Sequence, residues 1–142
     1  MRTYVDTSFL ASLYSPDANS PAAARTMQTS AGDRVLTTFG ELELANALEL
    51  RVFRKEVSAA QAGSSWKDFE QDLRSGVFQL RPLSDQVFER ARQLVRQTTA
   101  QLGTRTADLL HVAAALELEV DSLFSFDQQQ RKLAHAVKLK LN

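Results

Sequence analysis

Short strand-like segments alternate with long helical ones along the whole chain, and this alternation limits the possible folds more than any other feature. Five segments have the apolar, β-branched or alternating pattern of strands: residues 2–6, 34–38, 77–83, 122–126 and 137–141. Helices are expected between them, over residues 7–14, 20–31, 41–55, 58–74, 84–101, 104–118 and 128–134. Strands that alternate with helices predict a parallel sheet with helices on both faces. We therefore expect an α/β fold in which residues 1–142 form a single domain.

The composition restricts the chemistry that such a domain can perform. The chain has no cysteine and only two histidines, His111 and His135, so thiolate zinc sites and cysteine nucleophiles are excluded. If the protein is an enzyme with ionisable catalytic groups, we expect those groups to be carboxylates. Seventeen basic residues balance seventeen acidic ones, which counts mildly against a nucleic-acid-binding protein. No apolar run is long enough to cross a membrane and no signal-peptide pattern is present, so we expect a cytoplasmic protein without a membrane partner.

Four acidic residues occupy equivalent places in the expected fold. Asp6 ends the first strand, and Asp127 directly follows the strand at 122–126. Glu43 lies in about the first turn of the helix that leaves the second strand, and Asp108 lies in the first turn of a helix that we expect a threonine to cap. In open parallel sheets, ligands bind beyond the carboxyl ends of the strands. The four acids therefore map to the edge of the sheet where an active site is expected.

Carboxylates that gather in one place need a cation. Two unit charges ~4 Å apart repel each other by about 4 kcal/mol at an effective dielectric constant near 20. Oxygen ligands without histidine or cysteine favour Mg²⁺ or Mn²⁺. A metal held by carboxylates and water suits hydrolysis of a phosphodiester bond, because it lowers the pKa of a bound water and neutralises charge on the phosphate. Thr7 or Ser8, next to Asp6, would then hold a metal-bound water.

Each of these residues also has a structural interpretation. Asp6 and Asp127 have the positions of turn or helix-capping residues, and Asp108 could simply complement a helix dipole. Glu43 could be a solvated helix residue, with Glu41 and Glu49 as alternatives to it. His111 shares a helix face with Asp108, three residues before it, but a hydrogen-bonded core histidine is the better interpretation than a metal ligand.

The segments that carry these acids also carry a resemblance. "YVDTSFLASLY", "ELELANALELR", "TRTADLLHVAAAL" and "FSFD" resemble the PIN-domain family, and within it the VapC-type toxins of bacterial toxin–antitoxin pairs. The likeness runs from Arg2 to about Ala134, with the motifs in the order of the family. It implies a three-layer α/β/α sandwich around a mainly parallel sheet, and an endonuclease that cleaves RNA with Mg²⁺ or Mn²⁺.

The resemblance also assigns roles to particular residues and implies partners. The metal-binding and catalytic acids of the family match Asp6, Glu43, Asp108 and Asp127, and its hydroxyl near the metal matches Ser8. The implied partners are an RNA substrate, a small antitoxin protein that wraps the toxin, and a second copy of the chain in a homodimer. The basic residues after Asp127 come later than is usual in the family, so the phosphate contacts are open; the candidates are Arg51, Arg105 and Arg131.

Three functions agree with these features. The leading one is a metal-dependent endoribonuclease that acts as the toxin of a toxin–antitoxin pair. The second is a PIN-type nuclease in RNA processing that has no antitoxin, and the same acids would serve it. The third is a non-enzymatic, receiver-like α/β signalling module. Such a module normally has paired acids before the aspartate of its first strand, whereas Asp6 is the first acid of this chain.

Overall fold

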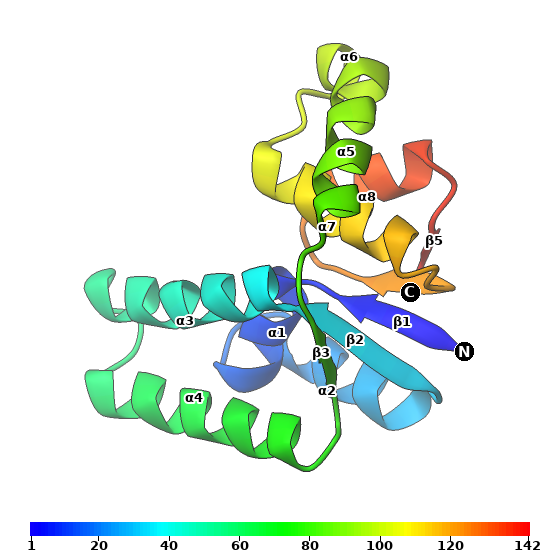
Figure 1. Cartoon of the computed structure of the whole chain (residues 1–142). Coiled ribbons are helices and arrows are strands. Elements are labelled where there is room, and N and C mark those ends of the chain that lie inside the picture. Colours follow the sequence, from blue (N-terminus) through cyan, green and yellow to red (C-terminus); the bar gives the residue numbers. More distant parts are fainter.

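A five-stranded parallel sheet forms the centre of the molecule (Figure 1). The computed structural model describes residues 1–142, and the strand order across the sheet is β3-β2-β1-β4-β5. All four neighbouring pairs are parallel, with Tyr4 opposite both Val35 and Leu123. The strands are β1 (Arg2–Val5), β2 (Asp33–Thr37), β3 (Gln79–Arg81), β4 (Ser122–Phe124) and β5 (Lys140–Leu141).

Helices cover both faces of this sheet, as the sequence pattern predicts (Figure 1). One layer holds the connections among the first three strands: α1 (Thr7–Tyr14), α2 (Ser20–Thr29), α3 (Thr38–Phe53) and α4 (Ala59–Arg74). The other layer holds α5 (Asp85–Leu94), η1 (Val95–Thr99), α6 (Ala100–Leu102), α7 (Thr106–Glu117) and α8 (Gln128–Ala136). The fold is thus the expected α/β/α sandwich. None of its helices combines the length and apolar character that crossing a membrane requires.

Two hydrophobic cores lie on opposite faces of the sheet because side chains alternate along each strand. In β1, Tyr4 is buried in the core under α5, α7 and α8, whereas Val5 is buried in the core under α1–α4. Leu123 and Phe124 of β4 divide in the same way. Because these strands are buried on both faces, nearly every residue of β1 and β4 is apolar or hydrogen-bonded inside the sheet.

The sheet order puts a topological switch point between β1 and β4. The chain builds β1, β2 and β3 outward in one direction and then crosses back to add β4 and β5 on the other side of β1. The connections that leave β1 and β4 therefore diverge to opposite faces. This geometry opens a crevice at the carboxyl ends of the two strands, where Asp6 and Asp127 lie.

Several element boundaries differ from the sequence-based prediction. The helix expected over 41–55 begins at Thr38, because the hydroxyl of Thr37 accepts a hydrogen bond from Gly40 N–H at 3.1 Å and caps it. The strand expected over 77–83 contains only residues 79–81. The single helix expected over 84–101 contains a five-residue π-helical turn, η1. These differences change where elements start and end, and leave their order as predicted.

The prediction of a strand over 137–141 is wrong for its first three residues. Helix α8 continues to Ala136 and ends in a Schellman motif, with Lys138 N–H bonded to His135 O and Leu139 N–H to Ala134 O. Lys138 adopts φ 63° in the position that glycine usually fills. Only Lys140 and Leu141 are left to pair with β4.

Candidate active site

One cavity of about 470 Å³ contains all four acids that the sequence singled out. It opens beyond the carboxyl ends of β1 and β4, between the amino-terminal ends of α1, α7 and α8 and the middle of α3. The polar side chains that line it are Asp6, Thr7, Ser8, Glu43, Arg54, Arg105, Asp108, His111, Asp127 and Gln130. Thirteen residues line the cavity and only three are hydrophobic, so it suits a polar or charged ligand.

Asp6 forms the floor of the cavity and is only 1% exposed. One carboxylate oxygen accepts hydrogen bonds from Ser8 Oγ at 2.7 Å and from Phe9 N–H at 2.9 Å, so Asp6 caps α1. The other oxygen accepts a bond from Gln130 Nε2 at 2.5 Å. Burial raises the pKa of Asp6 above its usual value of 3.8, and the opposing effects of Ser125, His111, Phe9 N–H and Ser8 are smaller. Asp6 forms no ion pair with a lysine or arginine.

Glu43 projects into the cavity from the second turn of α3, one turn later than the sequence suggested. Its Oε1 accepts a hydrogen bond from Thr7 Oγ1 at 2.6 Å and pairs with His111 Nε2. Burial alone would raise the pKa of Glu43, but the bonds from His111 and Thr7 outweigh it and leave the pKa below its usual value. The carboxylate is therefore held in one orientation and in its ionised form.

A buried chain of hydrogen bonds supports Glu43 from behind. His111 is 3% exposed, and its Nδ1 is 2.7 Å from the hydroxyl oxygen of Tyr4, which lies 3.3 Å from Thr37 Oγ1. His111 is thus a hydrogen-bonded core histidine, and it also contacts a candidate catalytic acid. Burial raises the pKa of Tyr4, so its hydroxyl stays neutral and is able to fix the tautomer of the imidazole.

Asp108 and Asp127 face each other across one arginine. Arg105 donates from Nε to Asp108 Oδ2 at 3.0 Å and from its terminal nitrogen to Asp108 Oδ1 at 3.2 Å and Asp127 Oδ2 at 2.6 Å. Arg105 is also the N-cap residue of α7, where the sequence suggested a threonine. Asp127 caps α8 through Gln130 N–H at 3.0 Å. Burial opposes ionisation of Asp127, but this N–H and Arg105 outweigh it and lower the pKa.

The donor set of the cavity fits a hard divalent cation, although the carboxylates do not yet converge on one point. Four carboxylates from four separate segments line a single open cavity, and oxygen is the donor that Mg²⁺ and Mn²⁺ prefer. No three acidic or imidazole side chains of residues 1–142 are close enough together to hold an ion as they stand. Two of the four acids, Asp108 and Asp127, are instead paired with Arg105.

The three arginines proposed as phosphate contacts have different positions. Only Arg105 lines the cavity. Arg51 forms an ion pair with Asp17 at 2.7 Å and is partly buried, and Arg131 donates to the carbonyl oxygen of Ser125 at 3.0 Å. Both have structural partners outside the cavity.

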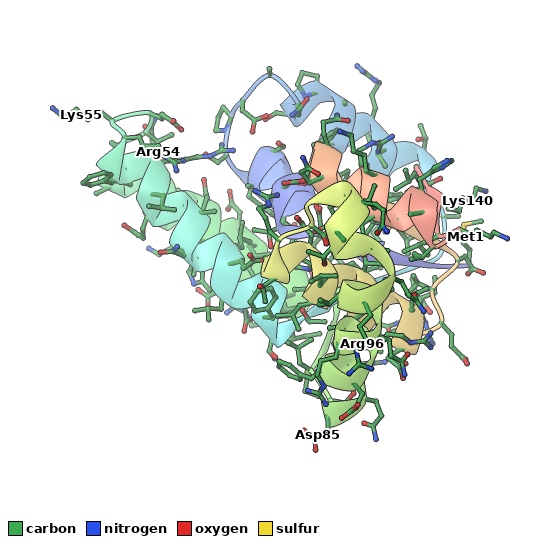
Figure 2. All side chains as sticks on the ribbon, turned by 90° about the horizontal axis from the view of Figure 1, so that it is seen from above. Met1, Arg54, Lys55, Asp85, Arg96 and Lys140 are labelled. Atoms are coloured by element: carbon green, nitrogen blue, oxygen red, sulfur yellow. The ribbon has the colours of Figure 1, made fainter.

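Sequence reasoning did not single out Arg54 and Gln130, which both line the cavity. Arg54 lies at the carboxyl end of α3, on the side of the molecule opposite Met1 and Lys140 (Figure 2). Gln130 is 2% exposed, although it stands in the polar run "QQQR". The sequence did contain a signal for Gln130. It lies three residues after Asp127, in the first turn of the helix that Asp127 caps, and a side chain there points back toward the edge of the sheet.

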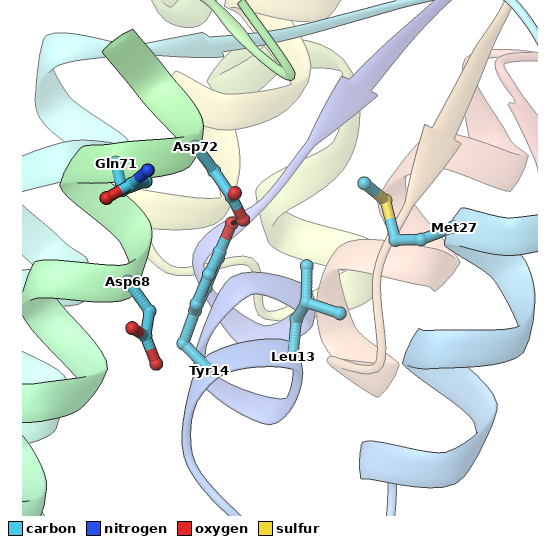
Figure 3. Close-up of a pocket in the computed structure, with 6 residues that line it drawn as sticks. All are labelled: Leu13, Tyr14, Met27, Asp68, Gln71 and Asp72. Carbon is cyan, nitrogen blue, oxygen red and sulfur yellow. Dashed lines mark hydrogen bonds between the residues drawn. The ribbon is translucent and has the colours of Figure 1, made fainter. Parts of the chain in front are cut away.

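A second cavity, of about 480 Å³, lies between α1, α2 and α4 and holds none of the four acids (Figure 3). Tyr14 and Asp72 meet at its centre, where the hydroxyl donates to Asp72 Oδ2 at 2.5 Å and ties α1 to α4. Its lining comes from three helices and includes no strand end. The cavity at the switch point is therefore the better candidate for an active site.

The family comparison agrees with this geometry. The model of the PIN domain matches residues 3–136, which is almost the whole chain. The chain belongs to the PIN-domain family. A receiver-like signalling module, the third function that agreed with the sequence, is therefore no longer an alternative. No functionally curated protein sequence matches this PIN domain.

Solved structures with the same fold include toxins and toxin–antitoxin complexes. VapC20 of Mycobacterium tuberculosis, a toxin that cleaves the sarcin–ricin loop, is 17% identical; the alignment has a TM-score of 0.71 and covers 92% of this chain and 93% of that one. VapBC2 of Rickettsia felis, bound to a DNA fragment from its promoter, is 16% identical, with a TM-score of 0.68 and coverage of 100% and 98%. VapBC-1 of nontypeable Haemophilus influenzae is 14% identical, with a TM-score of 0.67 and coverage of 100% and 97%. At these identities the likeness shows the fold, and this PIN domain resembles VapC toxins in architecture.

Proposed function

We propose that this PIN domain is a Mg²⁺- or Mn²⁺-dependent endoribonuclease and the toxin of a toxin–antitoxin pair. One observation carries the proposal: Asp6, Glu43, Asp108 and Asp127 come from four separate segments of a PIN domain and line one cavity. The substrate is RNA, and the bond cleaved is a phosphodiester.

The electrostatics of the cavity support a bound cation. Four acids face two arginines there, and RNA carries negative charge on every phosphate. Each pair of like charges ~4 Å apart costs about 4 kcal/mol at an effective dielectric constant near 20, so the phosphate would be repelled. A bound Mg²⁺ or Mn²⁺ would reverse that repulsion, activate a water and polarise the scissile phosphate.

The residues of the chain would divide the work as follows. Asp6, Glu43, Asp108 and Asp127 would hold the ion. Ser8 and Gln130 each bind one oxygen of Asp6, whereas Thr7 and His111 both bind Oε1 of Glu43 and leave its other oxygen free for the ion. The sequence suggested that Thr7 or Ser8 holds a metal-bound water; here each hydroxyl donates directly to a carboxylate, which is the support that metal-binding carboxylates commonly have. Because these partners are already in place, Asp6 and Glu43 would need little reorganisation to bind the ion.

The partner proposed for this toxin is a small antitoxin. The support comes from solved structures of the same fold whose names describe two-component complexes, among them a toxin–antitoxin complex from Klebsiella pneumoniae. A homodimer and a cytoplasmic location remain part of the proposal. A PIN-type nuclease without an antitoxin would use the same acids, and a short reading frame directly beside the gene would favour the toxin.

The test is cleavage of total cellular RNA by purified protein, with mapping of the cut ends. We expect wild type to cleave in Mn²⁺ and not in a metal chelator, and Asp6→Asn and Glu43→Gln each to abolish cleavage with the fold retained. Glu49→Gln is the matched control, because Glu49 is exposed on the same helix and lies outside the cavity. Full activity of Asp6→Asn, or equal activity with and without metal, would reject the proposal.

A further inference from the structure

A three-residue ion pair of the cavity lies where the proposed metal would need to bind. Arg105 bridges Asp108 and Asp127, two of the four acids, with three side-chain bonds of 2.6 to 3.2 Å. Asp108 is buried, at 4% side-chain exposure, so removing its positive partner without replacement would leave a buried charge unpaired. Any change in the partners of Asp108 therefore needs another cation to take the place of the guanidinium.

The guanidinium of Arg105 is able to move away from Asp108 and Asp127 without a change in the backbone. Its side chain is 61% exposed, whereas the acids that it bridges are much less so. Its backbone N–H points at Asp108 Oδ2, 3.3 Å away, as part of the N-cap of α7, and that contact would remain if the guanidinium moved. Only rotation about the bonds of an exposed side chain is needed, and no helix or strand has to shift.

We propose that Arg105 is an internal counter-cation that competes with the divalent ion for Asp108 and Asp127, and that the ion, on binding, releases the guanidinium to grip an RNA phosphate at the mouth of the cavity. The inference rests on the proposed function. Arg105 then binds different partners in the metal-free and the metal-bound states. Without metal it neutralises two acids and keeps the site assembled. With metal it offers its planar, two-armed donor set to the substrate, for which a phosphate is a well-matched acceptor.

Arg54 provides an internal comparison. It lines the same cavity and carries the same charge, but its side chain forms no ion pair or hydrogen bond. Removing either arginine makes the cavity more negative by one unit. Only removal of Arg105 also frees the oxygens of Asp108 and Asp127. The difference between the two variants isolates competition for those oxygens from the general effect of charge.

The first experiment measures Mn²⁺ affinity by titration calorimetry in the absence of RNA. Proteins to compare are wild type, Arg105→Gln, Arg105→Lys, Arg54→Gln and Asp108→Asn. We expect Arg105→Gln to bind Mn²⁺ at least about fivefold more tightly than wild type, a coupling at the lower end of the usual range. Arg54→Gln should gain clearly less, and Arg105→Lys, which keeps the charge but loses the two-armed bridge, should lie between wild type and Arg105→Gln.

The second experiment measures the binding of a short single-stranded oligoribonucleotide in saturating Mn²⁺, where Arg105 is released, and counts only RNA that is still uncleaved in each sample. The affinity of Arg105→Gln for this RNA should be lower than that of wild type. Its slope of log affinity against log salt should be shallower by roughly 0.7, the amount expected for one lost phosphate contact on a single strand. An unchanged slope would overturn the phosphate role of Arg105.

The outcomes separate this inference from the proposed function. If wild type binds Mn²⁺ and Arg105→Gln binds it no more tightly than Arg54→Gln does, the competition is refuted and the nuclease proposal stands. If neither wild type nor Arg105→Gln binds Mn²⁺, both fail. If wild type binds weakly, Arg105→Gln binds well and Asp108→Asn does not bind, both are supported. If Arg105→Gln unfolds below the temperature of the titration, Arg105→Lys takes its place. An affinity of Arg105→Lys for Mn²⁺ equal to that of wild type would then count against the competition.

Discussion

Asp127 has two roles in this account, and two substitutions are able to separate them. Its carboxylate caps α8 by accepting a hydrogen bond from Gln130 N–H, and it also faces the cavity, where it would bind the metal. Asparagine caps a helix about as well as aspartate does, whereas alanine does not. Asp127→Asn therefore removes the charge and keeps the cap, and Asp127→Ala removes both.

The sizes of the two effects follow from the contacts. Loss of an N-cap costs about 1 kcal/mol. The ion pair with Arg105, whose side chain is 61% exposed, adds a few tenths of a kcal/mol at most after screening by solvent. With an unfolding entropy of roughly 2.1 cal/mol/K per residue over 142 residues, 1 kcal/mol lowers the melting temperature by about 3 °C. Asp127→Ala should therefore melt about 3–4 °C below wild type in a chelator, and Asp127→Asn within about 1 °C of it.

The assay is thermal unfolding with and without Mn²⁺. An ion present at 100 times its dissociation constant stabilises the folded state by about 2.7 kcal/mol, which raises the melting temperature of wild type by about 9 °C. Both variants should lose most of that rise, because both lose the negative charge of the carboxylate that attracts the ion. If Asp127→Asn shows the full rise in Mn²⁺, Asp127 is a helix cap alone and its place among the metal ligands is refuted.

Three further predictions concern stability without metal. Asp6→Asn should stabilise the protein at neutral pH, because the pKa of Asp6 is raised in the folded state and its ionised form therefore opposes folding. This gain in stability should shrink as the pH falls through the pKa of the folded state, and should vanish below about pH 3.8. Denaturant unfolding at a series of pH values measures it. Lys55→Gly and Lys138→Gly should each stabilise by roughly 1 kcal/mol, because both lysines have positive φ at a helix end; a loss of stability in either would contradict this. Tyr4→Phe should cost about 1–3 kcal/mol, because it leaves His111 Nδ1 buried without its partner, and an unchanged unfolding midpoint would contradict the hydrogen-bond chain.

The positions of the acids at strand ends could be predicted from the sequence because chain order encodes them. A residue that directly follows a strand of a parallel sheet lies at the carboxyl edge, whatever the packing of the helices. Asp6 and Asp127 are such residues, and β1 and β4, which precede them, are neighbours in the sheet. Glu43 and Asp108 follow less directly, because each depends on where its helix begins, and both helices begin elsewhere than the sequence suggested.

Side-chain pairing across the cavity could not be predicted. Arg105 and Asp127 are separated by 22 residues and belong to different elements, so their contact depends on how α7 packs beside β4. His111 has the spacing of a core residue and is buried as expected; only the structure shows that its second nitrogen reaches Glu43, which comes from the other helical layer.

The last strand was overestimated for a local reason. "VKLKL" alternates in the manner of a strand, and the sequence offers no glycine to mark the end of the helix before it. Lys138 takes the left-handed conformation instead, so the helix end uses up residues that the pattern assigns to the strand. Lys55 and Glu119 end α3 and α7 in the same way.

The most direct test of the account is a crystal structure of the protein grown or soaked in Mn²⁺, with anomalous diffraction measured to locate the metal. We predict an anomalous peak in the cavity, about 2.0–2.3 Å from carboxylate oxygens of Asp6 and at least one of Asp108 and Asp127. The guanidinium of Arg105 should have moved away from them. A cavity without a peak at saturating Mn²⁺, with Arg105 still bridging Asp108 and Asp127, would contradict the claim that these acids form a metal-dependent nuclease site.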